Sequence, residues 1–227
     1  MASLGQERRL ERMQADYSDA KIMSDRGYNL AIGLTVLYGI VMNVILCATV
    51  ENVYAYINPI LFLIIYIVCA MVGIFMANKS SNPFISFVGY NLIVIPLGLV
   101  ISTLVFAYGG LNSEIVMEAF YYTALITAIM VLAATLFPQV FAKVGGFLFV
   151  SLIGIIIASI IGMFFSGGFY IISIFAAAIF SLYIGYDIYR SQQYAKTLDN
   201  AIDSAIDIYL DIANLFIRIL QILGRRD

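Results

Sequence analysis

Seven long apolar runs constrain the fold of this chain more than any other feature. Each run is close to the ~20 residues that an α-helix needs to cross the roughly 30 Å of hydrocarbon in a bilayer. Only helices and closed barrels satisfy their backbone hydrogen bonds there, and long runs without alternation favour helices. We therefore predict an all-α membrane protein, a seven-transmembrane-helix bundle with helices near residues 28–50, 59–77, 83–107, 116–137, 146–166, 169–188 and 204–223.

The composition supports this prediction and excludes several classes of function. Hydrophobic residues make up 63% of the chain and charged residues only 11%, and a soluble domain cannot bury that much apolar surface. The formal net charge of −2, without a basic patch, argues against binding of nucleic acid. There is no histidine, so any response to pH must come from carboxylates. Cys47 and Cys69 lack the spacing of metal ligands or of a disulfide framework.

Basic residues suggest how the chain is oriented in the membrane. We expect a cytoplasmic N-terminal segment at 1–27, which is not a cleavable signal peptide, a transmembrane domain at 28–223 and a short tail at 224–227. The connections on the same side as the N-terminus are basic, and those on the other side carry no Lys or Arg, as the positive-inside rule requires. The basic residues in question are Lys79, Lys143, Arg190 and Lys196. Without an organelle signal, a prokaryotic plasma membrane is the simplest location.

The last apolar run carries a continuous polar stripe. Its polar residues recur every three or four positions, which places them on one helix face. They are Asp203, Asp207, Asp211, Asn214, Arg218 and Gln221. Each charge would cost roughly 2.5–3.5 kcal/mol in lipid, so we expect the stripe to face protein or water, with the other six helices around it. The alternative is a helix lying on the membrane surface, but such helices have Lys-rich rather than acidic polar faces.

Asp187 and Asp211 are the strongest candidates for function, because ionisable residues inside membrane helices usually mark ion or proton pathways. Both are expected at similar depth in the cytoplasmic half. Two carboxyl groups in a poorly solvated place cannot both ionise easily, so they would share a proton and titrate as a unit. Loss of that proton would leave two like charges that repel each other or attract a hard cation such as Ca²⁺. The alternative is that Asp187 caps its helix or pairs with Arg190.

Regularly spaced small residues in the fifth apolar run suggest a close contact between helices. Gly154, Ala158 and Gly162 recur at four-residue spacing in the fifth run, which favours close approach of another helix of the same chain.

The stretches FSLYIGYDIYRSQ and AIDIYLDIANLFIRILQILG closely resemble the Bax inhibitor-1 family (transmembrane Bax inhibitor motif proteins). EAFYYTA at 118–124 and GGFLFVSLIGIIIAS at 145–159 also match its pattern. The resemblance implies a prokaryotic member with a seven-helix bundle and a central last helix. It also implies a pH-dependent calcium leak controlled by two aspartates, which match Asp187 and Asp211, and whose protonated pair holds the pore closed toward the cytoplasm.

Four further residues are candidate accessories. Lys79 lies near the position where some relatives carry an arginine that can pair with the aspartates. Asp207 stands where a small polar residue is more common, and it could join Asp187 and Asp211 as a calcium ligand. Glu118 near the start of the fourth helix either interacts with the helix dipole or contacts cations at an outer mouth. Arg218 lies on the polar stripe itself.

A pH-sensitive calcium leak channel is therefore the predicted function, with calcium ions, protons and the lipid bilayer as partners, no cofactor and a monomeric state. We do not expect an enzyme. A proton-coupled cation exchanger could use the same carboxylates, and a non-conducting regulator that acts through partners is also open. An intramembrane aspartyl protease is less favoured. Tyr186-Asp187 fits the first motif of that class, but Tyr209-Leu210-Asp211 replaces the expected Gly-x-Gly-Asp and no Pro-Ala-Leu follows.

Overall fold

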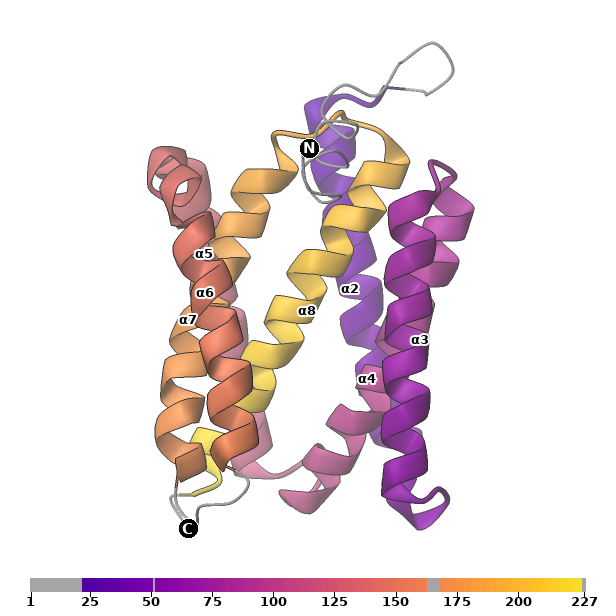
Figure 1. The fold of residues 1–227 in the computed structure, drawn as a ribbon, viewed down its shortest axis with the longest axis vertical. Coiled ribbons are helices and arrows are strands. Elements are labelled where there is room, and N and C mark those ends of the chain that lie inside the picture. The colour runs from indigo at the N-terminus through magenta and orange to yellow at the C-terminus, as the bar shows by residue number, and fades with distance from the viewer. Residues whose placement is uncertain (1–21, 51, 163–167, 226–227) are drawn as a thin grey trace. The chain divides into compact units, whose positions relative to one another are not determined.

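The computed structural model describes residues 22–50, 52–162 and 168–225, and in these ranges the regular structure is entirely helical (Figure 1). The all-α prediction is thereby confirmed. The predicted N-terminal segment up to residue 21, and Arg226 and Asp227 of the predicted tail, lie outside the described residues. The described elements are α2 (Asp25–Thr49), the 3₁₀ helix η1 (Val53–Ala55), α3 (Pro59–Lys79), α4 (Pro83–Ala107), α5 (Glu114–Leu136), α6 (Pro138–Gly162), α7 (Gly168–Ser191) and α8 (Leu198–Leu223).

Six of the described helices, α2 to α7, are long and apolar enough to cross a membrane. The chain is therefore a multi-pass membrane protein. The remaining helix, α8, has 26 residues but is far more polar than the others. Its charged residues are Asp199, Asp203, Asp207, Asp211 and Arg218.

Two helices, α6 and α8, begin six or more residues earlier than the apolar runs predict. We expected the fifth helix to start at 146, but α6 starts at Pro138, because a proline in the first turn sacrifices no backbone hydrogen bond. Lys143 therefore lies inside the helix, and Phe137 alone separates α5 from α6. α8 starts at Leu198 rather than 204, where the Thr197 hydroxyl oxygen accepts a hydrogen bond from the Asn200 amide at 3.2 Å.

The chain divides into two compact units, which we describe separately. Unit 1 comprises Met1–Phe106 and Ser191–Asp207, and unit 2 comprises Ala107–Arg190 and Ile208–Asp227. The helix α8 contributes its first part to unit 1 and its remainder to unit 2.

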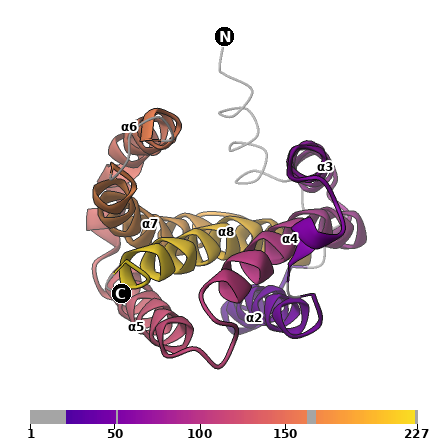
Figure 2. The same cartoon turned by 90° about the horizontal axis from the view of Figure 1, so that it is seen from below.

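In unit 1, α4 packs against both α2 and α3 (Figure 2). Gly73 of α3 and Gly89 of α4 let the two backbones touch, since a Cβ added at either one would lie 2.5 or 2.6 Å from the carbonyl oxygen of the other. On the α2 side, the Tyr90 hydroxyl of α4 donates to the carbonyl oxygen of Thr35 at 2.9 Å. The close helix contact predicted for the small residues of α6 is not found at Gly154, because a Cβ added there would meet nothing within 4 Å.

In unit 2, α8 packs against α5 and α7. The rings of Phe120 on α5 and Phe216 on α8 stack with centroids 4.6 Å apart. The Ser173 hydroxyl of α7 donates to Oε1 of Gln221 at 3.0 Å. These contacts fix the part of α8 that carries Asp211 within its own unit.

Candidate functional site

Asp187 and Asp211 both belong to unit 2, and both are buried, with 7% of each residue exposed. Asp187 lies in the last turns of α7, four residues before Ser191. Asp211 lies in the middle of α8, 13 residues after Leu198. Helical backbone on both sides holds each carboxylate more precisely than a loop would.

Close packing of α6 against α7 positions the turn that carries Asp187. Gly185 lies directly under the ring of Phe141, and a side chain at Gly185 would collide with that ring. One residue further, the Tyr186 ring covers Gly145, where an added Cβ would come within 2.6 Å of the tyrosine hydroxyl. The two residues before Asp187 are therefore interlocked with α6, and this restricts rotation of α7 at the site.

Arg190 is the cationic neighbour of Asp187. Its Nη2 lies 3.5 Å from Oδ1 of Asp187, one helical turn along α7. Strong charge-assisted hydrogen bonds are shorter, about 2.7–2.9 Å, so this is a loose ion pair. The guanidinium also lies over the Tyr186 ring, 5.6 Å from its centroid. The pairing with Arg190 that formed the alternative interpretation of Asp187 is thus present in the structure.

Tyr183 lies in the same surroundings as the two acidic residues. Its hydroxyl is partly buried and is near enough to Asp211 and Asp187 for both negative charges to act on it. A phenol can donate a hydrogen bond to a carboxylate and can accept one from a protonated carboxyl group. Sequence reasoning gave no tyrosine a role. The available signal was the four-residue spacing between Tyr183 and Asp187, which sixteen tyrosines made ambiguous.

The accessory candidates lie in varied surroundings. Lys79 is exposed at the end of α3, and its ammonium lies over the Phe75 ring, 5.2 Å from the centroid. Glu118 is exposed one turn inside α5, whose first residue is Glu114, so Glu114 and not Glu118 is the carboxylate nearest the helix start. Asp207 is half-buried and is grouped with unit 1.

Arg218, the remaining candidate, lies in the second half of α8. Its Nη1 donates to Oε1 of Gln221 at 3.2 Å. Across residues 22–50, 52–162 and 168–225, no three His, Cys, Asp or Glu side chains form a group that could hold a metal ion. The calcium-ligand set of Asp187, Asp211 and Asp207 stays a prediction.

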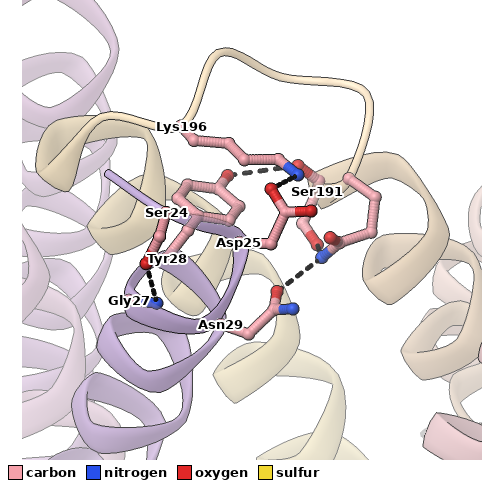
Figure 3. Close-up of polar contacts among 8 residues, drawn as sticks. Ser24, Asp25, Gly27, Tyr28, Asn29, Ser191 and Lys196 are labelled. Carbon is pink, nitrogen blue, oxygen red and sulfur yellow. Dashed lines mark hydrogen bonds and ion pairs between the residues drawn. The ribbon is translucent and has the colours of Figure 1, made fainter. Parts of the chain in front are cut away.

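A second polar cluster, missed by sequence reasoning, joins the start of α2 to the end of α7 and the start of α8 in unit 1 (Figure 3). Its centre is Tyr28, which is fully buried. The Tyr28 hydroxyl donates to the carbonyl oxygens of Ser191 and Asn200, at 3.1 and 3.4 Å, and lies 3.3 Å from the Ser204 hydroxyl. One side chain thus contacts the last residue of α7 and the first turns of α8.

Further contacts surround Tyr28. The Met23 amide donates to the carbonyl oxygen of Lys196 at 2.8 Å, and the Lys196 ammonium forms an ion pair with Asp25. The Gln192 amide donates to Oδ1 of Asn29 at 2.8 Å. The α7–α8 connection is therefore bound to the start of α2 near both of its ends, at Gln192 and at Lys196 (Figure 3).

Comparisons with known proteins agree with the resemblance in the sequence. An uncharacterized protein of Helicobacter pylori (strain J99) is 35% identical over 144 residues, which are 62% of this chain and 58% of that protein. An uncharacterized membrane protein of Streptococcus pyogenes serotype M3 is 30% identical over 149 residues, 58% of this chain and 65% of that protein. An uncharacterized protein of Borreliella burgdorferi is 37% identical over 94 residues, 37% of this chain and 40% of that protein.

The matched segments span less than two thirds of each of these relatives, and all three relatives are bacterial, consistent with a prokaryotic member. The family model described as inhibitor of apoptosis-promoting Bax1 matches residues 26–227. That match includes Asp187, Asp211 and every described helix apart from the first residue of α2. The chain belongs to the Bax inhibitor-1 family.

Proposed function

We propose that this protein is a calcium-permeable leak channel that opens as the pH rises, gated by a proton that Asp187 and Asp211 share. The observation that carries the proposal is that both carboxylates are buried in the same unit, one on each of two helices that contact each other. Family membership supports the proposal, because the family match at residues 26–227 includes the helices that carry Asp187 and Asp211.

The gating follows from the cost of burying charge. With one proton between them, Asp187 and Asp211 form a hydrogen-bonded link that holds α7 to α8 and keeps the route closed. Without it, two negative charges repel each other strongly because the surroundings have a low dielectric constant. Separation of the helices or entry of a cation relieves that repulsion. Calcium flux therefore increases as the pH rises through the range in which the pair loses its proton.

Arg190 adjusts the pH at which this happens. A guanidinium 3.5 Å from Asp187 favours the charged form of that carboxylate and so opposes proton sharing. Replacing Arg190 by Gln removes this effect, so the pair keeps its proton to higher pH. The midpoint of the flux-against-pH curve then moves to higher pH in Arg190→Gln.

We further propose that α8 crosses the plasma membrane with the other six helices around it and with the N-terminus in the cytoplasm. Its 26 residues give a length of about 39 Å, which is sufficient for a span. The residues at 201–206, 208, 209 and 211–213 are buried, so α8 exposes little of its polar surface. Lys79, Arg190 and Lys196 then lie on the cytoplasmic side, as the positive-inside rule requires.

The test is calcium flux into liposomes that contain the purified protein and a calcium-sensitive dye, measured between pH 5 and pH 8.5. We expect wild-type flux to rise with pH and Asp211→Asn to lose this dependence, because an amide cannot share the proton. Glu114→Gln is the matched control, since Glu114 is an exposed carboxylate at the start of α5. Its pH profile should equal that of the wild type.

Two results would contradict the proposal. Unchanged pH dependence in Asp211→Asn would exclude the shared proton as the gate. Flux that occurs only when a proton gradient is imposed, and not at equal pH on both sides, would instead indicate a proton-coupled exchanger.

A further inference from the structure

Arg218 is the basic residue within α8, and its charge is only partly accommodated by the residues around it. Its Nη1 donates to Oε1 of Gln221, but that oxygen also accepts a hydrogen bond from Ser173. The Nε atom of Arg218 is buried and has no hydrogen-bond acceptor among the described residues. A guanidinium carries five N–H donors and a permanent charge. One shared neutral oxygen does not satisfy it.

A charge in this position requires compensation. Ionisable groups within membrane helices pair with each other, with backbone carbonyls or with water, because an isolated charge is costly there. Neither the Arg190–Asp187 ion pair nor the Lys196–Asp25 ion pair involves Arg218. The structure therefore leaves room for an anion that the chain itself does not supply within its described ranges.

A second guanidinium lies close to the same place. Arg225 follows the end of α8, and its guanidinium lies over the ring of Tyr170, 5.3 Å from the centroid. Tyr170 and Ser173 are three residues apart on α7, so they share one helix face. Arg218, through Gln221, and Arg225 are thus both linked to one face of the first turns of α7.

We propose that Arg218 and Arg225 form a binding site for a phosphate group, as in the headgroup of an anionic phospholipid. An arginine fork matches two phosphate oxygens, and basic sites between membrane helices bind such headgroups. Arg218 lies five residues before the end of α8, about 7.5 Å along the helix axis, which is within reach of the headgroup region. A phosphate there gives the buried Nε of Arg218 an acceptor.

The site also accounts for an irregularity in the charge pattern. If α8 crosses the membrane, Arg225 lies on the side where the other connections carry no Lys or Arg. An arginine that binds a lipid phosphate is stabilised on that side.

The experiment measures thermal unfolding of the purified protein in a neutral detergent. A thiol-reactive dye reports unfolding, because Cys47 is buried in the folded chain. Phosphatidylglycerol, phosphatidylcholine and inorganic phosphate are titrated separately. We expect phosphatidylglycerol to raise the unfolding midpoint, and Arg218→Gln to weaken its apparent affinity about ten-fold or more, the loss expected for a charge-assisted hydrogen-bond pair.

Two further variants sharpen the result. Arg218→Lys keeps the charge but loses the fork, so its affinity should lie between those of the wild type and Arg218→Gln. Lys143→Gln removes one positive charge from an exposed position on α6 and should bind as the wild type does. If Arg218→Gln does not fold, the test is the comparison of phosphatidylglycerol affinity between Arg218→Lys and the wild type.

The three titrations also identify the source of the phosphate. An Arg218-dependent response to phosphatidylglycerol but not to phosphatidylcholine supports a lipid site. An Arg218-dependent response to inorganic phosphate supports the same site with a soluble occupant. Equal responses of the wild type and both Arg218 variants to all three compounds would overturn the proposal. Because no flux is measured, its failure is separate from failure of the leak-channel proposal.

Discussion

Tyr28 is a residue through which the start of α2 contacts both the end of α7 and the start of α8. Its ring is fully buried, and its hydroxyl reaches Ser191 at the end of α7 and Asn200 and Ser204 in the first turns of α8. Asp187 lies one turn before Ser191, and Asp211 lies about two turns after Ser204. A hydroxyl in this position fixes how α7 is joined to α8, and hence supports both helices that carry the acidic pair.

Tyr28→Phe should therefore loosen this junction without removing the packing of the ring. The variant loses hydrogen bonds to buried carbonyl oxygens, so we expect a decrease of about 1–2 kcal/mol in the free energy of unfolding. Amide hydrogen exchange should accelerate between residues 191 and 204. Thermal unfolding and hydrogen-exchange mass spectrometry provide the two measurements.

Tyr54→Phe is the control for Tyr28→Phe. Tyr54 is 42% exposed, and its ring packs edge-on against Phe62, so its hydroxyl contributes little to the folded state. We expect its stability and exchange to match those of the wild type. Equal exchange at residues 191–204 in Tyr28→Phe and the wild type would show that the hydroxyl does not hold the junction.

The sequence reveals some of these residues and hides others for a physical reason. Asp187 and Asp211 can be identified because a carboxylate in an apolar run is costly and therefore rare. Tyr28 and Tyr183 cannot be identified in this way, because tyrosine is common both in protein cores and at membrane interfaces. Only the positions of Ser191, Asn200 and Ser204 around Tyr28 distinguish it from the other tyrosines.

Among the helices, the contact of α3 with α4 is the closest backbone approach described in unit 1, through Gly73 and Gly89. We expect Gly89→Ala to destabilise the protein by about 1–3 kcal/mol, because the added Cβ would lie 2.6 Å from the carbonyl oxygen of Gly73 and the helices must move apart. The measurement is the unfolding midpoint in detergent.

Gly154→Ala is the matched control for that substitution. A Cβ added at Gly154 meets nothing within 4 Å, and alanine is favoured over glycine inside a helix by roughly 0.5–1 kcal/mol. Its stability should therefore be unchanged or slightly increased. If the two variants were equally stable, the close contact at Gly89 would not contribute to stability.

At this scale, the sequence predicts the helices well and their contacts poorly. The apolar runs correspond to α2 to α7, but the start of α6 differs because Pro138 is compatible with a first helical turn as well as with a helix end. The small residues at 154, 158 and 162 and those at 73 and 89 look equally suitable for packing. Which set is used depends on the neighbouring helix, and spacing within one helix does not specify that neighbour.

For the whole molecule, α8 is the element that the sequence describes least completely. Its polar stripe indicates that it must be shielded, and its residues are indeed largely buried. The division of α8 between two units, with Asp199 and Asp203 in one and Asp211 in the other, results from packing between segments far apart in the sequence. Periodicity within α8 contains no information about that packing.

The path of α8 leads to a prediction about the topology of the whole chain. Single cysteines are introduced at exposed positions as Asn112→Cys, Gln193→Cys and Arg225→Cys, in a chain whose own cysteines are replaced by alanine. If seven helices cross, with the N-terminus in the cytoplasm, a membrane-impermeant maleimide should label positions 112 and 225 in intact cells. Position 193 should react only after permeabilisation. Labelling of position 225 together with position 193 would instead mean that α8 enters the membrane and returns. Arg218 and Arg225 would then meet lipid phosphates on the cytoplasmic side.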